Sequence, residues 1–264
     1  MERLSDNVYV HSVQTQGYTV SCAVVVGSDR VFVFDTLESP ESVRPVRELL
    51  DKVAGLRRIT VVNSHHHWDH VYGNAAFAAY DIVAHRLCRR LIVSQSESES
   101  EKIPLPPKEG VPLPNVHFGD RLTYMDESST VHLLHTPGHS EDSIIMYIDE
   151  QEMLFAGDTL EWPFPSFAQR DACELYLRTL RQLNQLPVSI VVPGHGPVMG
   201  KEIMDNNQRY IEELYDVVRT AKDSRVPRGE LHMPVEEFAP RGVEIDDVYR
   251  EQHRENVEWA YDEV

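Results

Sequence analysis

The fold and the chemistry of this chain are decided by one stretch of sequence, Ser64-His65-His66-His67-Trp68-Asp69-His70. It follows an apolar run at 59–62 that predicts a short buried strand. Side chains alternate across a strand, so His65 and His67 point the same way in extended backbone and His66 points away. Imidazole and carboxylate are ligands of zinc and, less exclusively, of iron and manganese. The H-x-H-x-D-H spacing therefore predicts a metal site that can hold two adjacent ions.

Three further motifs each place a polar residue where a predicted strand ends: Thr136-Pro137-Gly138-His139-Ser140 after 131–135, Gly157-Asp158-Thr159 after 152–156, and Pro193-Gly194-His195-Gly196 after 189–192. The glycines let the backbone turn sharply and approach an ion without a Cβ in the way. Ligands at the ends of successive strands share one rim of a sheet sandwich. We therefore expect all four motifs to meet at a single site.

Strands and helices alternate along the chain in a pattern typical of α/β proteins. Strands are expected at 8–12, 19–27, 30–35, 59–62 and 82–84, with helices at 40–55, about 70–79 and 86–93. After a Pro-rich surface loop at about 95–116, strands are expected at 121–125, 131–135, 144–148, 152–156 and 189–192, with a helix at 171–186. Residues 1–200 are thus predicted to form one domain that carries the motifs. Residues 201–264 are predicted to form a helical C-terminal extension that packs on it.

Composition excludes several classes of protein. Among 264 residues, 25 Lys and Arg stand against 43 Asp and Glu, a net charge of −18 that disfavours nucleic acid and anionic membrane surfaces as partners. No apolar run approaches the roughly 18 residues of a spanning helix, and the N-terminus lacks the apolar core of a secretory signal. Three widely spaced cysteines indicate free thiols rather than a disulfide framework. We expect a cytoplasmic protein whose partner is a small-molecule substrate.

The four motifs, in this order, resemble the metallo-β-lactamase superfamily of metal-dependent hydrolases over residues about 8 to 200. The resemblance implies a four-layer αβ/βα sandwich with a binuclear metal site at its edge. It implies two divalent ions, zinc first, with iron or manganese as alternatives. By motif position, His65, His67 and His139 would hold one ion, Asp69, His70 and His195 the other, and Asp158 would bridge both.

Within this superfamily the phrase HHHWDHVYGN resembles the hydroxyacylglutathione hydrolase (glyoxalase II) branch, and Asp158 stands where several β-lactamases have a cysteine. The resemblance implies a metal-bridging hydroxide that attacks a carbonyl, with Asp69 orienting it. Tyr72 stands where the branch usually has glycine, and we expect it to donate a proton if it faces the ions. Candidates for binding the glutathione carboxylates are Lys222, Arg225, Arg228 and Arg241.

A thioester needs no general acid at such a site, because a thiolate leaves without a proton. We therefore expect a hydrolase of thioesters or related small acyl esters. Alternatives are a lactonase or β-lactamase of the same fold, a mononuclear-iron persulfide dioxygenase, and a metal-binding module without turnover. The aromatic residues Trp162, Phe164 and Phe167 are either a core plug or an apolar substrate wall.

Overall fold

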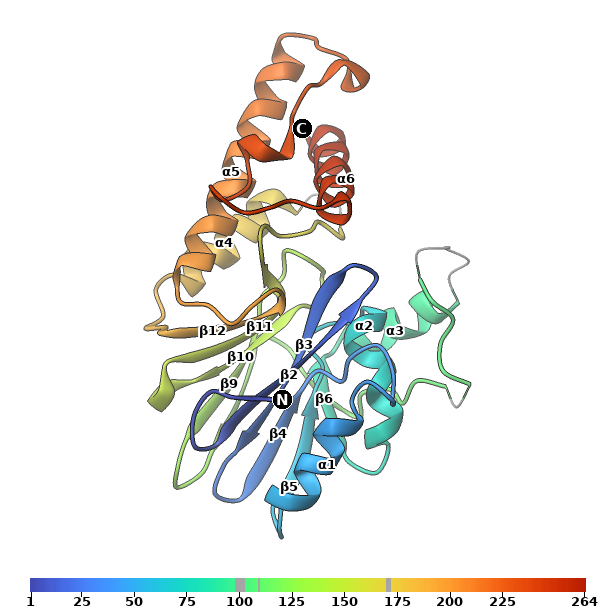
Figure 1. Cartoon of the computed structure of the whole chain (residues 1–264), viewed down its shortest axis with the longest axis vertical. Coiled ribbons are helices and arrows are strands. Elements are labelled where there is room, and N and C mark those ends of the chain that lie inside the picture. The colour runs from blue at the N-terminus through green and yellow to red at the C-terminus, as the bar shows by residue number, and fades with distance from the viewer. Residues whose placement is uncertain (98–102, 109, 170–171) are drawn as a thin grey trace.

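The strands form one sheet that is bent into two halves in this computed structural model, which describes residues 1–97, 103–108, 110–169 and 172–264 (Figure 1). The first half contains β1 (Glu2–Arg3), β2 (Val8–Thr15), β3 (Tyr18–Val26), β4 (Arg30–Phe34), β5 (Arg58–Val62), β6 (Asp81–His85) and β7 (Val116–Phe118). The second contains β8 (Arg121–Met125), β9 (Thr130–His135), β10 (Ile144–Ile148), β11 (Met153–Glu161) and β12 (Ile190–His195). A single residue pair, His195 with Val20, joins β12 to β3.

Strand direction follows from the connections. Neighbours β4, β5, β6 and β7 run parallel, since helices or long segments cross between them. Short turns connect β8, β9, β10 and β11, which run antiparallel, and β12 then pairs with β11 in parallel through the crossover helix α4 (Cys173–Leu183). The buried strands β4 and β5 are almost continuously apolar because both of their faces are covered.

Three apolar layers separate the elements. One lies between the two sheet halves and includes Phe34 and Phe155. A second packs α1 (Arg44–Val53) on the first half, beside a smaller cluster under α2 (Trp68–Val71) and α3 (Cys88–Ser96). The third packs α4, α5 (Glu202–Asp223) and α6 (Asp247–Glu263) on the second half. Helix, sheet, sheet and helix thus form the predicted αβ/βα sandwich.

The prediction of one α-helix at about 70–79 is wrong. The α-helix ends at Val71, and a 3₁₀ segment, Tyr72–Phe77, follows. The carbonyl of His70 accepts hydrogen bonds from the backbone N and Oγ1 of Thr36, at 2.9 and 3.1 Å, and is not used to extend the helix. A Cβ on Gly73 would lie 1.8 Å from the Thr36 carbonyl, so this close crossing requires glycine.

The other boundaries differ by a few residues. The expected loop at 95–116 begins after α3 and ends at β7, a short strand that the sequence analysis missed, and its residues 98–102 and 109 lie outside the described part. The predicted start of the helix at 171 also lies outside it. Both C-terminal helices form, and Asp246 caps α6 by accepting a 3.1 Å bond from the Tyr249 N–H. The domain boundary at 200 stays a prediction.

Cys22, Cys88 and Cys173 are buried free thiols, as expected. Through the described ranges, none of the helices combines the length and apolar character needed to cross a bilayer.

Candidate metal centre

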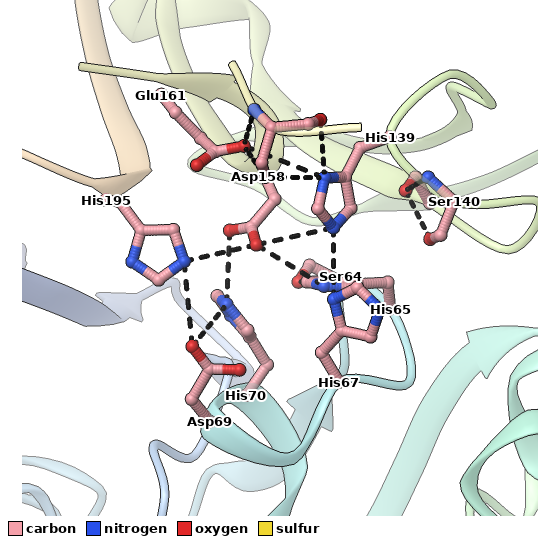
Figure 2. Close-up of polar contacts among 12 residues, drawn as sticks. Ser64, His65, His67, Asp69, His70, His139, Ser140, Asp158, Glu161 and His195 are labelled. Atoms are coloured by element: carbon pink, nitrogen blue, oxygen red, sulfur yellow. Dashed lines mark hydrogen bonds and ion pairs between the residues drawn. The ribbon is translucent and has the colours of Figure 1, made fainter. Parts of the chain in front are cut away.

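The seven predicted ligands lie together at one rim of the sandwich (Figure 2). The ligand-type atoms of one group all lie within 4.8 Å of one another, and this group contains His65, His67, His139 and Asp158. The same holds for a second group, which contains Asp69, His70 and His195. Asp158 reaches both groups, because its Oδ1 lies 3.1 Å from Nε2 of His70 and its Oδ2 lies 3.5 Å from Nε2 of His65.

Glycine makes this convergence sterically feasible. A Cβ on Gly194 would lie 2.0 Å from Oδ1 of Asp158, so only glycine allows β12 to pass so close to this carboxylate. Gly157 has a φ of +48°, and a Cβ there would lie 2.5 Å from Cβ of Ser64. The glycines in the motifs therefore serve the close approach of the strand ends.

Hydrogen bonds at the far side of each ring orient the imidazoles. Nδ1 of His70 donates to Oδ2 of Asp35 at 2.9 Å, and Nδ1 of His195 donates to the carbonyl of Thr19 at 2.9 Å. Nδ1 of His139 lies 3.2 Å from the carbonyl of Ser166. These three rings therefore direct Nε2 at the centre, the arrangement that outer hydrogen bonds impose on metal-binding histidines.

Several buried polar atoms at the centre lack a hydrogen-bond partner among the described residues. Nε2 of His65, Nε2 of His70 and Oδ1 of Asp158 are buried, and no described residue forms a hydrogen bond with them. Nε2 of His139 lies 3.0 Å from Nδ1 of His67, which brings two ring nitrogens face to face. Buried unsatisfied polar atoms are costly, and a cation would satisfy all of these at once. The residues present fit a divalent metal.

The electrostatics divide the histidines into two kinds. Burial and the neighbouring imidazoles hold the pKa values of His65 and His67 well below the usual range, so both rings are neutral and ready to bind a metal. Against the effect of burial, Asp158 raises the pKa of His195 to about 9, and Asp158 and Asp69 raise that of His70. Metal binding at the second group therefore has to displace protons.

Asp69 has a partner that the sequence analysis missed. The hydroxyl of Tyr18 donates to Oδ2 of Asp69 at 3.2 Å, and its ring meets the ring of His195 edge-on at 4.7 Å. Tyr18 lies at the start of β3 and belongs to no motif, so only the pairing of β3 with β12 reveals it.

Tyr72 does not occupy the position we expected. It is buried against Trp68 in the cluster under α2 and α3, and its hydroxyl donates to the carbonyl of Pro104 at 3.2 Å. It is absent from the described residues that line the cavity at the metal centre. The geometry therefore gives Tyr72 no route to the substrate, and Tyr18 is the tyrosine that reaches the centre.

A buried carboxylate and a hydroxyl behind His139 were also missed. Oε1 of Glu161 accepts hydrogen bonds from the N–H and Oγ of Ser166, at 2.8 and 2.6 Å, and lies 3.6 Å from Nδ1 of His139. Glu161 follows Asp158 by three residues at the end of β11, and an acidic residue ending an apolar strand was the available signal. His66 belongs to none of the metal-type groups in the described residues, and its Nδ1 lies 2.8 Å from Oδ1 of Asp142.

A cavity of about 640 Å³ opens onto the centre. Phe167 lines it, whereas Phe164 is a core residue stacked on Tyr210 with ring centroids 4.6 Å apart. A role for Phe167 as a substrate wall stays a prediction. The candidate cations are not in the described lining: Lys222, Arg225, Arg228 and Arg241. Lys222 instead bonds to the carbonyl of Tyr261, and Arg228 pairs with Asp262.

The fold and this rim define a class of protein: an αβ/βα sandwich with histidine and aspartate groups that could hold metal at its edge. The family model of the metallo-beta-lactamase superfamily matches residues 15–195, and the chain belongs to that superfamily. The superfamily points to a metal-dependent hydrolase. A metallo-beta-lactamase from Pontibacter korlensis has the same fold, with a TM-score of 0.65 and 17% identity over 80% of this chain and 97% of the other.

Curated relatives are similar over part of their length. An atrochrysone carboxyl ACP thioesterase of Aspergillus fumigatus is 31% identical over 97 residues, 37% of this chain and 29% of the relative. A hydroxyacylglutathione hydrolase of Synechococcus is 31% identical over 141 residues, 53% of this chain and 50% of the relative. The chain thus matches no more than half the length of these two proteins.

Proposed function

We propose that this protein is a binuclear metal-dependent hydrolase that acts on a thioester or a related small acyl ester. The observation that carries the proposal is the position of Asp158 between two groups of ligand atoms. Its Oδ1 lies 3.1 Å from Nε2 of His70, and its Oδ2 lies 3.1 Å from Nε2 of His195 and 3.5 Å from Nε2 of His139. A carboxylate with its two oxygens directed at different histidines is suited to bridge two ions.

The ligand assignment uses two of the three groups in the described residues that could hold a metal; the third contains Asp158, Glu161 and His195. His65, His67 and His139 would hold one ion, Asp69, His70 and His195 the other, and Asp158 would contact both. Two divalent ions, zinc first and iron or manganese as alternatives, would supply a nucleophile from water near neutral pH and polarise the scissile carbonyl.

Asp69 and Tyr18 act together beside the centre. Oδ2 of Asp69 lies 3.6 Å from Nε2 of His195, so this carboxylate would lie beside a water held at the centre and orient it. Burial and the neighbouring carboxylates raise the pKa of Tyr18 well above its usual range. Its hydroxyl therefore stays protonated, keeps its hydrogen bond to Asp69 and fixes the direction in which that carboxylate points.

The positions of two tyrosines favour a thioester. Tyr72 is turned away from the centre, and the raised pKa of Tyr18 makes its hydroxyl a weak acid, so neither of the two is suited to protonate a leaving group. A thiolate leaves without a proton, whereas an alkoxide or an amide nitrogen needs one. The names of the two curated relatives, an atrochrysone carboxyl ACP thioesterase and a hydroxyacylglutathione hydrolase, support the same substrate class.

The second ligand group favours a hydrolase over a mononuclear-iron dioxygenase, which would leave Asp69, His70 and His195 without a role. A small-molecule substrate also suits the net charge of −18, which opposes binding of nucleic acid.

The test is the hydrolysis rate of zinc-loaded protein on S-lactoylglutathione beside a lactoyl thioester that lacks the glutathione peptide. The proposal expects turnover of at least one thioester and none after the metal is removed. A lactone and a β-lactam in the same assay separate the alternatives. Hydrolysis of the lactone or the β-lactam without hydrolysis of a thioester would overturn the proposed substrate class. Oxygen uptake with one iron per chain would overturn the assignment as a hydrolase.

A further inference from the structure

The cavity above the metal centre is enclosed by side chains from distant parts of the chain. Leu91 on α3 and Ile103 line one side, and Tyr249 and Trp259 on α6 line the other. Phe167, from the segment after β11, lies in the same lining. The family match ends at residue 195. Helix α6, which forms one wall of the cavity, therefore lies outside the part of the chain that matches the family.

Two polar side chains of the lining are engaged within the protein. The side chain of Gln95 accepts a hydrogen bond from the Trp68 N–H at 3.2 Å and donates one to the His66 carbonyl at 2.9 Å. The hydroxyl of Ser166 donates to Glu161 at 2.6 Å. Half-buried apolar side chains such as Leu91 and Ile103 therefore make up much of the surface that the wall offers to a ligand.

Away from the metal centre, the charge of the cavity lining is negative. The described lining contains no lysine or arginine, and Glu161 and Glu255 add carboxyl groups to those of Asp69 and Asp158. A substrate carboxylate that entered between α3 and α6 would lose its hydration without gaining a cationic partner from this wall.

We propose that the cavity between α3 and α6 selects an uncharged, apolar acyl group, aliphatic or aromatic, and discriminates against a carboxylate near the scissile bond. This inference rests on the proposed function for its reaction, but its selectivity depends on the cavity alone. Any anionic part of the thiol carrier must then lie far enough from the sulfur to remain in solvent.

The test compares N-acetylcysteamine thioesters, which have an uncharged thiol part, with acyl groups of similar length. We expect kcat/KM for the pentanoyl thioester to exceed that for the succinyl thioester by at least about tenfold, and hexanoyl to exceed acetyl by a similar factor. Binding is measured separately with non-hydrolysable S-pentyl and S-(3-carboxypropyl) thioethers, through the fluorescence of Trp68 and Trp259, which both line the cavity. The S-pentyl compound should bind at least about tenfold more tightly.

A matched pair of variants on α3 tests whether the cavity lining causes the acyl selectivity. Leu91→Arg places a cation in the lining and should reduce the pentanoyl-to-succinyl ratio by about tenfold or more. Val93→Arg makes the same change two residues further along the helix, at a side chain that is 41% exposed and outside the described lining, and should leave the ratio unchanged.

The outcomes separate the two proposals. Equal binding of the two thioethers, or equal turnover of pentanoyl and succinyl thioesters, would overturn the selectivity of the cavity. Preferential binding of the S-pentyl compound without hydrolysis of any thioester would support the apolar cavity and overturn the proposed reaction.

Discussion

His67 and His139 face each other from opposite halves of the sandwich, with Nδ1 of one 3.0 Å from Nε2 of the other although 72 residues separate them. His67 precedes α2 in the first half, and His139 follows β9 in the second. The apolar layer between the halves therefore sets the distance between two candidate ligands of one ion. The two rings are thus placed to share one ion.

Removing either ring should empty the site that the two rings share. We expect His67→Ala and His139→Ala each to lose metal on dialysis and to reduce kcat by at least about a thousandfold. Elemental analysis and thioester hydrolysis measure the two effects. His232→Ala is the control, because His232 is exposed and belongs to none of the metal-type groups in the described residues. Full metal content and full activity in either ligand variant would refute the assignment.

Asp158 should govern how many ions are held. We expect Asp158→Ala to reduce the tightly bound metal from two ions per chain to one or fewer, since both groups lose a shared oxygen. The far-ultraviolet circular dichroism should stay close to that of the unaltered protein, because the change removes a charge rather than an apolar contact. Two tightly held ions in this variant would rule out the bridging role.

Glu161 and Ser166 should act on the metal through His139. We expect Ser166→Ala and Glu161→Gln to weaken metal binding by about 10- to 100-fold, as is typical for groups that orient a metal-binding histidine. Competition with a chelator measures the affinity, and kcat at saturating metal tests whether only affinity has changed. Asp142→Asn is a useful comparison, since Asp142 bonds to His66, which lies outside the metal-type groups of the described chain. Unchanged affinity in both variants would show that neither residue positions His139.

His85 should make folding stability depend on pH. Burial beside His135, whose ring stacks on it at 3.9 Å, lowers the pKa of His85 to about 4 from its usual value of 6.5. Between these pH values the unfolded chain binds a proton at His85 that the folded chain excludes. This residue's contribution is therefore complete above pH 6.5 and is lost as the pH falls toward 4.

The measurement is urea unfolding of His85→Phe and of the unaltered protein, both metal-free, from pH 7.5 to 4.5. The free energy of unfolding of the variant should fall less steeply with decreasing pH than that of the unaltered protein. Parallel curves would contradict a buried, neutral His85.

The sandwich and the gathering of its motifs could be predicted because apolar runs followed by turn residues mark the ends of strands in the sequence. His139 follows β9, His195 ends β12, and Asp158 lies within β11 three residues before its end, so neighbouring strands bring these residues to one rim. The metal roles themselves stay predictions, although the geometry brings every candidate ligand to that rim.

Other features depend on contacts that no local pattern contains. The prediction of an α-helix at 70–79 is wrong because Thr36, more than thirty residues earlier, donates a hydrogen bond to the carbonyl of His70. Tyr72 consequently lies in the cluster under α2 and α3, and Tyr18 reaches the centre through the pairing of β3 with β12. The apolar wall on α6 likewise arises from the packing of the C-terminal helices on the second half.

The central claim is that two ions held by these residues hydrolyse a thioester. The most direct measurement is the metal content of the dialysed protein together with its rate on pentanoyl-N-acetylcysteamine, before and after chelation and after zinc is restored. The account predicts two ions per chain, hydrolysis that disappears with the metal, and recovery when two equivalents of zinc are added. Hydrolysis that survives complete metal removal, or two bound ions with no turnover of any thioester, would contradict it.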